Sequence, residues 1–401
     1  MVDDSVNEAG LREIPASEIL NKIQKGEIIE YDHVIVRGDL DIKKLNLTFE
    51  NGKYLVNSKI KINNSQITGV FLFEHTIFDR TISFDSTQFN GDVYFRGAQF
   101  NEEAHFNDAN FSKNVYFSGS QFKGDANFFQ SQLKGDAYLN GVTFCGDAIF
   151  RGSLFKRIAD FQESHFNKDA YFRGAQFEGR VYFREAQFKG DAKFTRSRID
   201  NIADFNAIFS NNLAFDGSRI YSMILSEAVF ERNVTISLKS SDFVRLEVRW
   251  DPIRDKIIYD DITYLFLVKN FNYLGQFDDA DDCYYKYRTD KRKMHLKGII
   301  PKLFDYIAWI AYGYGVRPSN PLILSFGLFI ISVVIFISGF GLQELPGSIM
   351  NAMYLSVLVL TSSPKTDPLT GLYNVWGMIE RITGWLLMSC FLVVLAKRTL
   401  R

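Results

Sequence analysis

The amino-acid sequence predicts an all-β repeat domain followed by a helical hairpin and an all-α membrane domain. Large apolar residues recur at intervals of five and six between about positions 70 and 205. A run of 21 uncharged residues begins at Pro321, and a second apolar run lies near the end of the chain. The 38 Phe and 19 Tyr among 401 residues are an aromatic excess, which a regular stacked core would explain.

The composition excludes several classes of protein. The 46 Lys and Arg residues balance 47 Asp and Glu, so the basic stripe of a nucleic-acid-binding protein is missing and no nucleic-acid partner is expected. The cysteines Cys145, Cys283 and Cys390 lie far apart, which indicates neither a disulfide framework nor a zinc site. Five scattered histidines and the lack of HExxH, P-loop and GxSxG motifs predict no enzymatic activity, no cofactor and no metal.

Residues 1–32 are predicted to form a cap on the repeat domain. The opening stretch MVDDSVNEAGLREIP lacks a basic segment followed by an apolar one, so we expect no secretory signal and a cytosolic N-terminus. Residues 15–26 read as a short amphipathic helix with Ser17 as the N-cap and Gly26 at its end. This helix would cover the exposed edge of the first repeat.

The repeat is most regular between Phe84 and Phe194. A small residue, usually Ala, Ser or Val, stands two positions before most of its large residues, as in AQFEG, ANFSK and AYFRG. A period of 5.5 matches neither a helix nor a simple strand. A short strand with one small and one large residue facing inward, followed by a turn, would produce it.

These motifs resemble the units of pentapeptide-repeat proteins, with one residue inserted in every second unit. The resemblance covers about 150 residues and implies a right-handed quadrilateral β-helix with four units and about 22 residues per coil. Weaker units extend the pattern on both sides, so we place the domain at residues 33–240. The resemblance alone says almost nothing about function, because one fold hosts many activities.

The period of 22 also predicts one column on the outer surface. Tyr94, Tyr116, Tyr138 and Tyr182 differ by multiples of 22, so we expect them to stack, interrupted by Asp160. Tyr favours strand surfaces in general. Alternatively, the column is a contact face for a neighbouring subunit or a protein partner.

Residues 241–298 are predicted to form a helical hairpin linker. Tyr264, Leu267 and Phe271 have helical spacing and Gly275 closes that helix. The following run, DDADDCYYKYRTDKRKMHLK, has acids at its start and bases at its end, as the helix dipole favours. The hairpin resembles a single tetratricopeptide-type unit. Its acidic cluster lacks the central Gly and terminal Glu of an EF-hand loop, which favours a helix start over a calcium site.

Residues 299–318 are predicted to form an interfacial helix that couples the hairpin to the membrane domain. The stretch is amphipathic and rich in aromatic residues, which suits the headgroup region of a bilayer. Trp309, Tyr312 and Tyr314 are the candidate coupling residues.

The membrane domain is predicted at residues 319–401. Residues 321–341 carry no charge and are long enough, at about 1.5 Å per residue, to cross the bilayer. A second span is predicted at about 375–396, with Glu380 and Arg381 facing protein or a water-filled pore.

The distribution of bases predicts the orientation of the spans. Seven bases between Lys286 and Lys302 precede the first span, three follow the second, and Lys365 is the only base between the spans. The positive-inside rule therefore predicts a multi-pass protein of the cell membrane with both termini in the cytosol.

Residues 350–361 form an apolar run that is too short to cross but suits a re-entrant helix. The segment AMYLSVLVLTSSPKTDP, followed by MIERITGWLLMSCFLVVLAKR, resembles the pore domain of the two-transmembrane potassium-channel-type family. The resemblance implies a homo-oligomer around a pore for inorganic ions, with a filter of backbone carbonyls and a gate of second-span helices. It favours a tetramer, although a pentamer stays open. Gly384 is then a candidate hinge, or alternatively a site of close helix packing.

The sequence departs from that family at the filter. Where a potassium filter reads TVGYG, this chain has Thr361, Ser362, Ser363, Pro364, Lys365, Thr366 and Asp367. Pro364 fixes φ, and the glycines that let carbonyls line the axis are missing. We therefore expect a weakly selective pore, and the opposed charges of Lys365 and Asp367 leave the sign of the ion open.

These features favour an oligomeric ion channel with a cytosolic repeat domain. The alternative is a membrane-anchored β-helix scaffold that binds a protein partner, for which the short run at 350–361 would have no use. Since the cytosolic part precedes the first span, we expect a cytosolic signal to pass through the hairpin, the interfacial helix and then the first span. The sequence does not indicate the gating stimulus.

Overall fold

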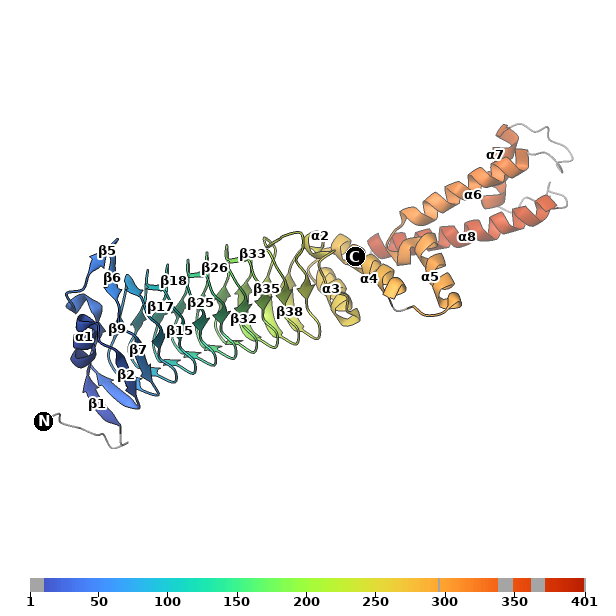
Figure 1. Ribbon diagram of the computed structural model, residues 1–401. Helices are drawn as coiled ribbons and strands as arrows, with labels where there is room; N and C mark the ends of the chain where they lie inside the picture. Colours follow the sequence, from blue (N-terminus) through green and yellow to red (C-terminus); the bar gives the residue numbers. More distant parts are fainter. Residues whose placement is uncertain (1–10, 295, 338–348, 362–371, 400–401) are drawn as a thin grey trace. The chain divides into compact units, whose positions relative to one another are not determined.

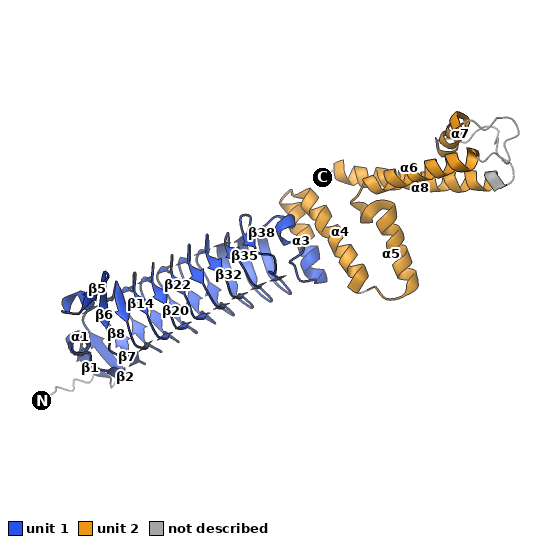
Figure 2. Ribbon diagram, turned by 45° about the horizontal axis from the view of Figure 1, so that its top comes forward, with its two compact units in different colours: residues 1–266 blue, residues 267–401 orange. Residues whose placement is uncertain are grey.

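The computed structural model describes residues 11–294, 296–337, 349–361 and 372–399 (Figure 1). The chain divides into two compact units, 1–266 and 267–401 (Figure 2). The first unit contains the β-strands and the second is helical.

The first unit is a parallel β-solenoid of about 11 turns with about 22 residues per turn. Strand β13 (Val93–Tyr94), for example, pairs with β17 (Val115–Tyr116), and residue 93 lies opposite residue 115. The described strands form one 18-stranded sheet and two 10-stranded sheets. The large sheet contains two columns of strands, so each coil has four sides. The predicted quadrilateral β-helix is confirmed.

Strand length is uniform in the middle of the solenoid and varies at its ends. Every strand from β11 (Ile82–Ser83) to β31 (Ala192–Lys193) has two residues. The longer strands are β1 (Arg12–Pro15), β2 (Ile29–Asp32), β3 (Val34–Arg37), β6 (Lys53–Val56), β7 (Ile60–Asn63), β10 (Thr76–Phe78), β32 (Arg198–Asp204), β35 (Arg219–Ile224) and β38 (Asp242–Glu247).

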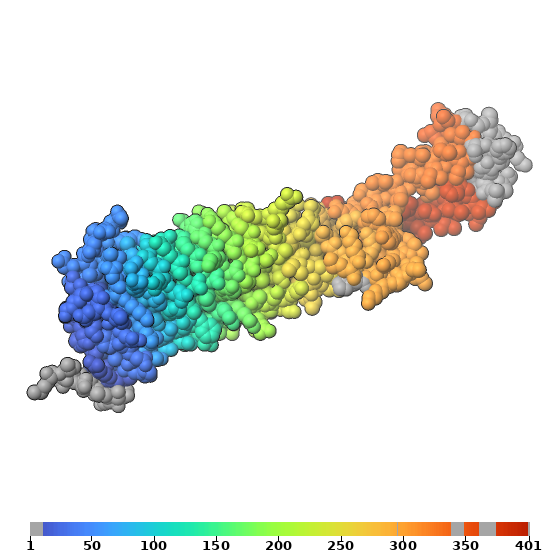
Figure 3. Space-filling model, viewed as in Figure 1, coloured from blue at the N-terminus to red at the C-terminus, as the bar shows by residue number. Residues whose placement is uncertain are grey.

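Stacked Phe rings fill the solenoid. Phe128 is fully buried, and its ring centroid lies 4.9 Å from that of Phe106 in one neighbouring coil and 4.9 Å from that of Phe150 in the other. Small residues such as Ala126 are also fully buried and leave room for these rings. Successive coils lie in direct contact along the unit (Figure 3). The period of 5.5 therefore reflects one small and one large inward residue on each side of the coil.

Helix α1 (Ala16–Lys25) lies at the N-terminal end of the solenoid, as the sequence predicted (Figure 1). Its apolar face is buried, and Gly26, with φ 68°, ends the helix in the left-handed conformation. The prediction that Ser17 caps the helix is wrong. Pro15 occupies the N-cap position without a side-chain hydrogen bond, so Ser17 lies inside the first turn.

The other end of the solenoid is closed by α2 (Trp250–Ile253) and the beginning of α3 (Asp261–Tyr273). Trp250 and Tyr264 are buried there, with ring centroids 6.1 Å apart. Apolar side chains therefore cover the last coil, as the end of a stacked repeat requires.

The second unit is helical and begins within α3. The elements that follow are α4 (Phe277–Met294), α5 (Ile299–Tyr312), the 3-10 turn η2 (Gly313–Gly315), α6 (Ser319–Ile337), α7 (Ile349–Thr361) and α8 (Leu372–Thr399). Two of the described helices are long and apolar enough to cross a membrane, over residues 319–337 and 374–399. Helix α7 is apolar but shorter, and it packs against both of them.

Candidate functional site

The candidate site lies where α6, α7 and α8 meet. Phe336 of α6 and Ala352, Leu355 and Val359 of α7 form a buried apolar cluster, against which Trp376 of α8 packs. One side of the short helix α7 is therefore covered by the two long helices. Its length of 13 residues is too small to cross a bilayer.

Beside the apolar cluster, each helix contributes one fully buried polar side chain. These are Ser332 of α6, Ser356 of α7 and Glu380 of α8. The Ser356 hydroxyl donates to Glu380 Oε1 at 2.6 Å, and the Trp376 indole N–H donates to Ser332 Oγ at 3.0 Å. Two hydrogen bonds of α8 thus join the three helices, one between Glu380 and α7 and one between Trp376 and α6.

The cluster determines how α7 can sit on its neighbours. A buried carboxyl is costly unless hydrogen bonds compensate for its lost water, and only one rotation of α7 places the Ser356 hydroxyl at Glu380. Within the described part of the chain, Glu380 Oε2 has no hydrogen-bond partner. Buried ionisable groups between membrane helices are commonly functional.

At Gly384, helix α8 lies close against α7. A Cβ atom at this position would lie 2.5 Å from Cδ2 of Leu360, so no side chain fits without a shift. Helix α8 continues without interruption through Gly384. Of the two interpretations of this glycine, this geometry supports close helix packing.

The predicted filter lies largely outside the described residues. Thr361 is the last residue of α7. The segment from Ser362 through Ser363, Pro364, Lys365 and Thr366 to Asp367 follows it and belongs to the part of the chain that is not described.

A second polar cluster joins α4 to α5 and η2. Asp305 of α5 is buried and accepts hydrogen bonds from Arg288 Nη2 at 2.8 Å and from the Tyr314 hydroxyl at 2.6 Å. Arg292 Nη1 lies 3.7 Å from the same carboxyl. Burial and the Asp305 carboxylate together raise the pKa of Tyr314, so its hydroxyl stays protonated and keeps donating.

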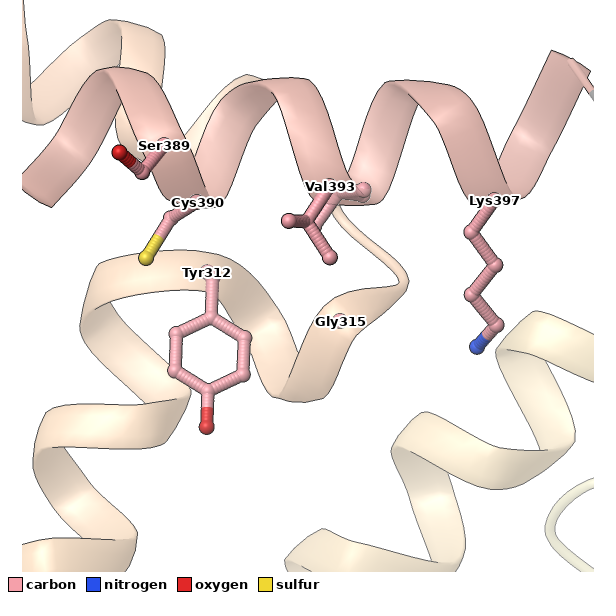
Figure 4. A pocket seen from close by; sticks show the side chains of 7 residues that line it. Tyr312, Gly315, Ser389, Cys390, Val393 and Lys397 are labelled. Atoms are coloured by element: carbon pink, nitrogen blue, oxygen red, sulfur yellow. The ribbon is translucent and has the colours of Figure 1, made fainter.

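The three predicted coupling residues face the protein to different degrees. Tyr314 is buried in the cluster around Asp305, and the Trp309 indole N–H donates to the Tyr285 hydroxyl of α4 at 2.5 Å. Tyr312 lines a pocket beside α8 (Figure 4). The exposed apolar side of α5 is formed by other residues, namely Ile299, Ile300, Leu303, Phe304, Ile307 and Ile310.

The acidic start of α4 contacts the segments next to both candidate spans. Asp282 pairs with Arg317, just before α6, at 2.9 Å, and Asp278 pairs with Arg398, near the end of α8, at 2.6 Å. The acidic cluster thus begins a helix, as predicted. Helix α4 therefore contacts α8 directly, in addition to the segment before the first span.

The predicted tyrosine column exists on the surface of the solenoid. The rings of Tyr94 and Tyr116 stack at 4.7 Å and those of Tyr116 and Tyr138 at 5.0 Å, both nearly parallel. Asp160 lies between Tyr138 and Tyr182 in the strand pairing, as expected. The rings are half-buried because they cover one another.

Comparison with protein-family models finds pentapeptide repeats at residues 73–121, 106–154 and 150–198. Residues 73–198 are pentapeptide repeats. The pentapeptide-repeat domain is followed by two helices that can cross a membrane, which supports a membrane-associated protein. No curated protein and no solved structure matches the chain.

The sequence alone did not reveal the cluster around Glu380. Ser332 and Ser356 are small polar residues that many membrane helices contain, and Glu380 was expected only to face protein or water. The sequence contains only a weak indication of this cluster, namely one acid and two serines in otherwise apolar helices. No repeat relates their positions. By contrast, the pentapeptide-repeat domain repeats its inward residues in every coil.

Proposed function

We propose that the protein is a homo-oligomeric, weakly selective ion channel in the cell membrane, with its pentapeptide-repeat domain and both termini in the cytosol. The supporting observation is the placement of α7. This apolar helix is too short to cross, yet it packs against two helices that can cross and is joined to α8 by the hydrogen bond between Ser356 and Glu380. A membrane anchor has no need of a third, partly inserted helix.

The expected selectivity follows from the residues after α7. The stretch from Thr361 to Asp367 would form the narrowest part of the pore, as in the potassium-channel-type family that the membrane domain resembles. Without a glycine-based cage of carbonyls, ions keep part of their hydration shell, and discrimination between potassium and sodium is lost. A tetramer is the favoured assembly and a pentamer is the alternative.

The test is a planar-bilayer recording of the purified full-length protein, first in asymmetric KCl and then with KCl opposed to NaCl. We expect single-channel currents and a low ratio of potassium to sodium permeability. A ratio above about 100 would overturn weak selectivity. In the same recordings, Lys365→Glu should move the reversal potential towards the equilibrium potential of the cation, and Asp367→Lys should move it towards that of chloride. Each variant reverses the sign of one of two opposed rings of charge.

The second candidate function is a membrane-anchored scaffold that binds a protein partner. The stacked column of Tyr94, Tyr116 and Tyr138 favours it, because Arg96 lies 4.1 Å from the Tyr116 ring and adds a cation to an aromatic surface. Assembled protein that carries no current under any of these conditions would support the scaffold over the channel.

A further inference from the structure

A pocket of about 440 Å³ lies beside the last third of α8, next to the end of α5 and η2 (Figure 4). Cys390, Val393 and Val394 of α8 line one side, and Tyr312 and Gly315 line the other. The volume falls within the range of about 300–1,000 Å³ that is usual for sites of small ligands. The pocket belongs entirely to the second unit.

The lining combines an apolar surface with one cation. Val393, Val394 and the ring of Tyr312 provide apolar surface, and Lys397 extends from the same helix one turn beyond Val393 (Figure 4). Within the described residues, no carboxylate lies within 4.0 Å of Lys397 Nζ, which lies 6.0 Å from the centroid of the Tyr284 ring. Its neighbour Arg398 is already paired with Asp278. Apolar walls with an unpaired ammonium group complement a ligand with a hydrocarbon part and an anionic part.

The position along α8 indicates the source of such a ligand. Lys397 and Arg398 form the basic end of a helix that can cross a membrane, and bases of this kind lie at the level of the cytoplasmic headgroups. Helix α5, which contributes Tyr312, carries six exposed apolar side chains, as expected of a helix at the same level. Phospholipids of the inner leaflet therefore reach the pocket directly.

We propose that the pocket binds one anionic phospholipid of the cytoplasmic leaflet, with an acyl chain against Val393 and Val394 and the headgroup phosphate at Lys397 Nζ. This inference rests on the proposed orientation in the membrane, with both termini in the cytosol, but does not depend on ion conduction. The bound lipid would add a link between the end of α5 and α8, which already contact one another beside the pocket.

Cys390 provides a native reporter of occupancy, because it lines the pocket while Cys283 is fully buried and Cys145 belongs to the solenoid. Full-length Cys145→Ser protein is reconstituted in vesicles of phosphatidylcholine alone or mixed with phosphatidylglycerol. The rate of Cys390 alkylation by a neutral maleimide is then measured. We expect alkylation about fivefold slower with phosphatidylglycerol, the ratio that corresponds to about 1 kcal/mol of attraction per Lys.

Two matched variants separate the pocket from the general surface potential. Lys397→Gln should abolish the difference between the two lipids, whereas Lys302→Gln, which removes an exposed base of α5 outside the pocket, should preserve it. Val393→Trp should fill the pocket and lower the number of phosphatidylglycerol molecules retained in native mass spectrometry.

Three results would overturn the proposal. Equal protection by both lipids would mean that the bilayer simply covers this surface. Protection by soluble glycerol phosphate alone would identify an anion site without a hydrocarbon part. Protection in detergent that rises with protein concentration, and not with added lipid, would assign the pocket to a second copy of the chain.

Discussion

Each inward Phe of the pentapeptide-repeat domain is held by rings in the neighbouring coils and on adjacent sides. Phe128 stacks on Phe106 and Phe150 and meets the edge of Phe117, whose centroid is 5.6 Å away. Truncation leaves a cavity that these rings cannot fill without losing their own contacts. The stability of the domain therefore resides in residues that solvent never reaches.

Phe128→Ala should lower the free energy of unfolding by about 3–5 kcal/mol, because the ring is fully buried. Tyr116→Ala should cost about 1 kcal/mol, since it removes two stacked contacts at a half-buried position. Denaturant titrations of the full chain measure both. The reverse order of the two values would contradict the assignment of inward and outward residues.

Asp147 and Asp169 occupy one column in consecutive coils but have different surroundings. Burial and the neighbouring Asp125 raise the pKa of Asp147. Burial also disfavours ionised Asp169, but its hydrogen bond with Lys193, at 2.6 Å, outweighs this effect and lowers the pKa of Asp169. The ionised form of Asp147 is thus destabilised by the fold, and that of Asp169 is stabilised.

Asp147→Asn should raise the free energy of unfolding at pH 7 by about 0.5 kcal/mol, because a like-charge contact disappears. Since the folded-state pKa of Asp147 lies above 3.8, the gain should shrink as the pH falls through that value and the carboxyl protonates. Asp169→Asn should lower the free energy of unfolding at pH 7, because Lys193 loses the closer of its two carboxylate partners and keeps only Asp191. Thermal melts between pH 3 and 7 check this, and equal effects of the two variants would be inconsistent with it.

At the scale of elements, the contact between α7 and α8 depends on the absence of a side chain at Gly384. Leu360 of α7 occupies the space that a Cβ atom would need. Helices that lack a hydrophobic driving force between them rely on such close contacts. The orientation of α7 is thus defined twice, by Gly384 and by the hydrogen bond between Ser356 and Glu380.

Gly384→Ala should destabilise the membrane helices by about 1–3 kcal/mol, because the new methyl group displaces Leu360. Adding Leu360→Ala should recover part of the loss by removing the clash. Thermal melts in detergent and single-channel recordings measure both variants. If Gly384 were instead a hinge, Gly384→Ala would change the open probability and Leu360→Ala would not restore it.

Which elements the sequence could predict depends on how often their pattern recurs. The solenoid repeats its inward residues in every coil, so neighbouring units establish the register even where one unit departs from the pattern. The helices α6 and α8 were predictable from the length of their apolar runs. The meeting of Ser356 with Glu380 occurs once and joins residues 24 positions apart on two helices, so no local pattern encodes it. The side of α5 that faces α4 is likewise determined by Asp305, a single buried acid in an apolar helix.

At the scale of the whole molecule, one coil of the solenoid can be removed without changing the strand register or the inward residues of the remaining coils. Residue 127 pairs with residue 149 one coil later, so deletion of residues 127–148 joins Ala126 to Ile149 in the existing register. Because each coil contacts only its neighbours, the shortened solenoid should fold and assemble like the parent. Circular dichroism melts and native mass spectrometry check this, and aggregation of this variant would contradict it.

Because each coil has four sides, the number of residues in a segment of the solenoid also determines how far the chain turns about the solenoid axis. Inward residues alternate at five and six positions, so 11 residues make half a coil and turn the chain by half a revolution about the solenoid axis. A deletion of 11 residues would keep every Phe facing inward and leave the fold intact, yet it would present the opposite sides of all later coils. The number of residues in the repeat therefore sets a direction as well as a length. A partner or subunit that binds one side of the solenoid beyond the deletion would therefore lose its contacts after a deletion of 11 residues and keep them after a deletion of 22.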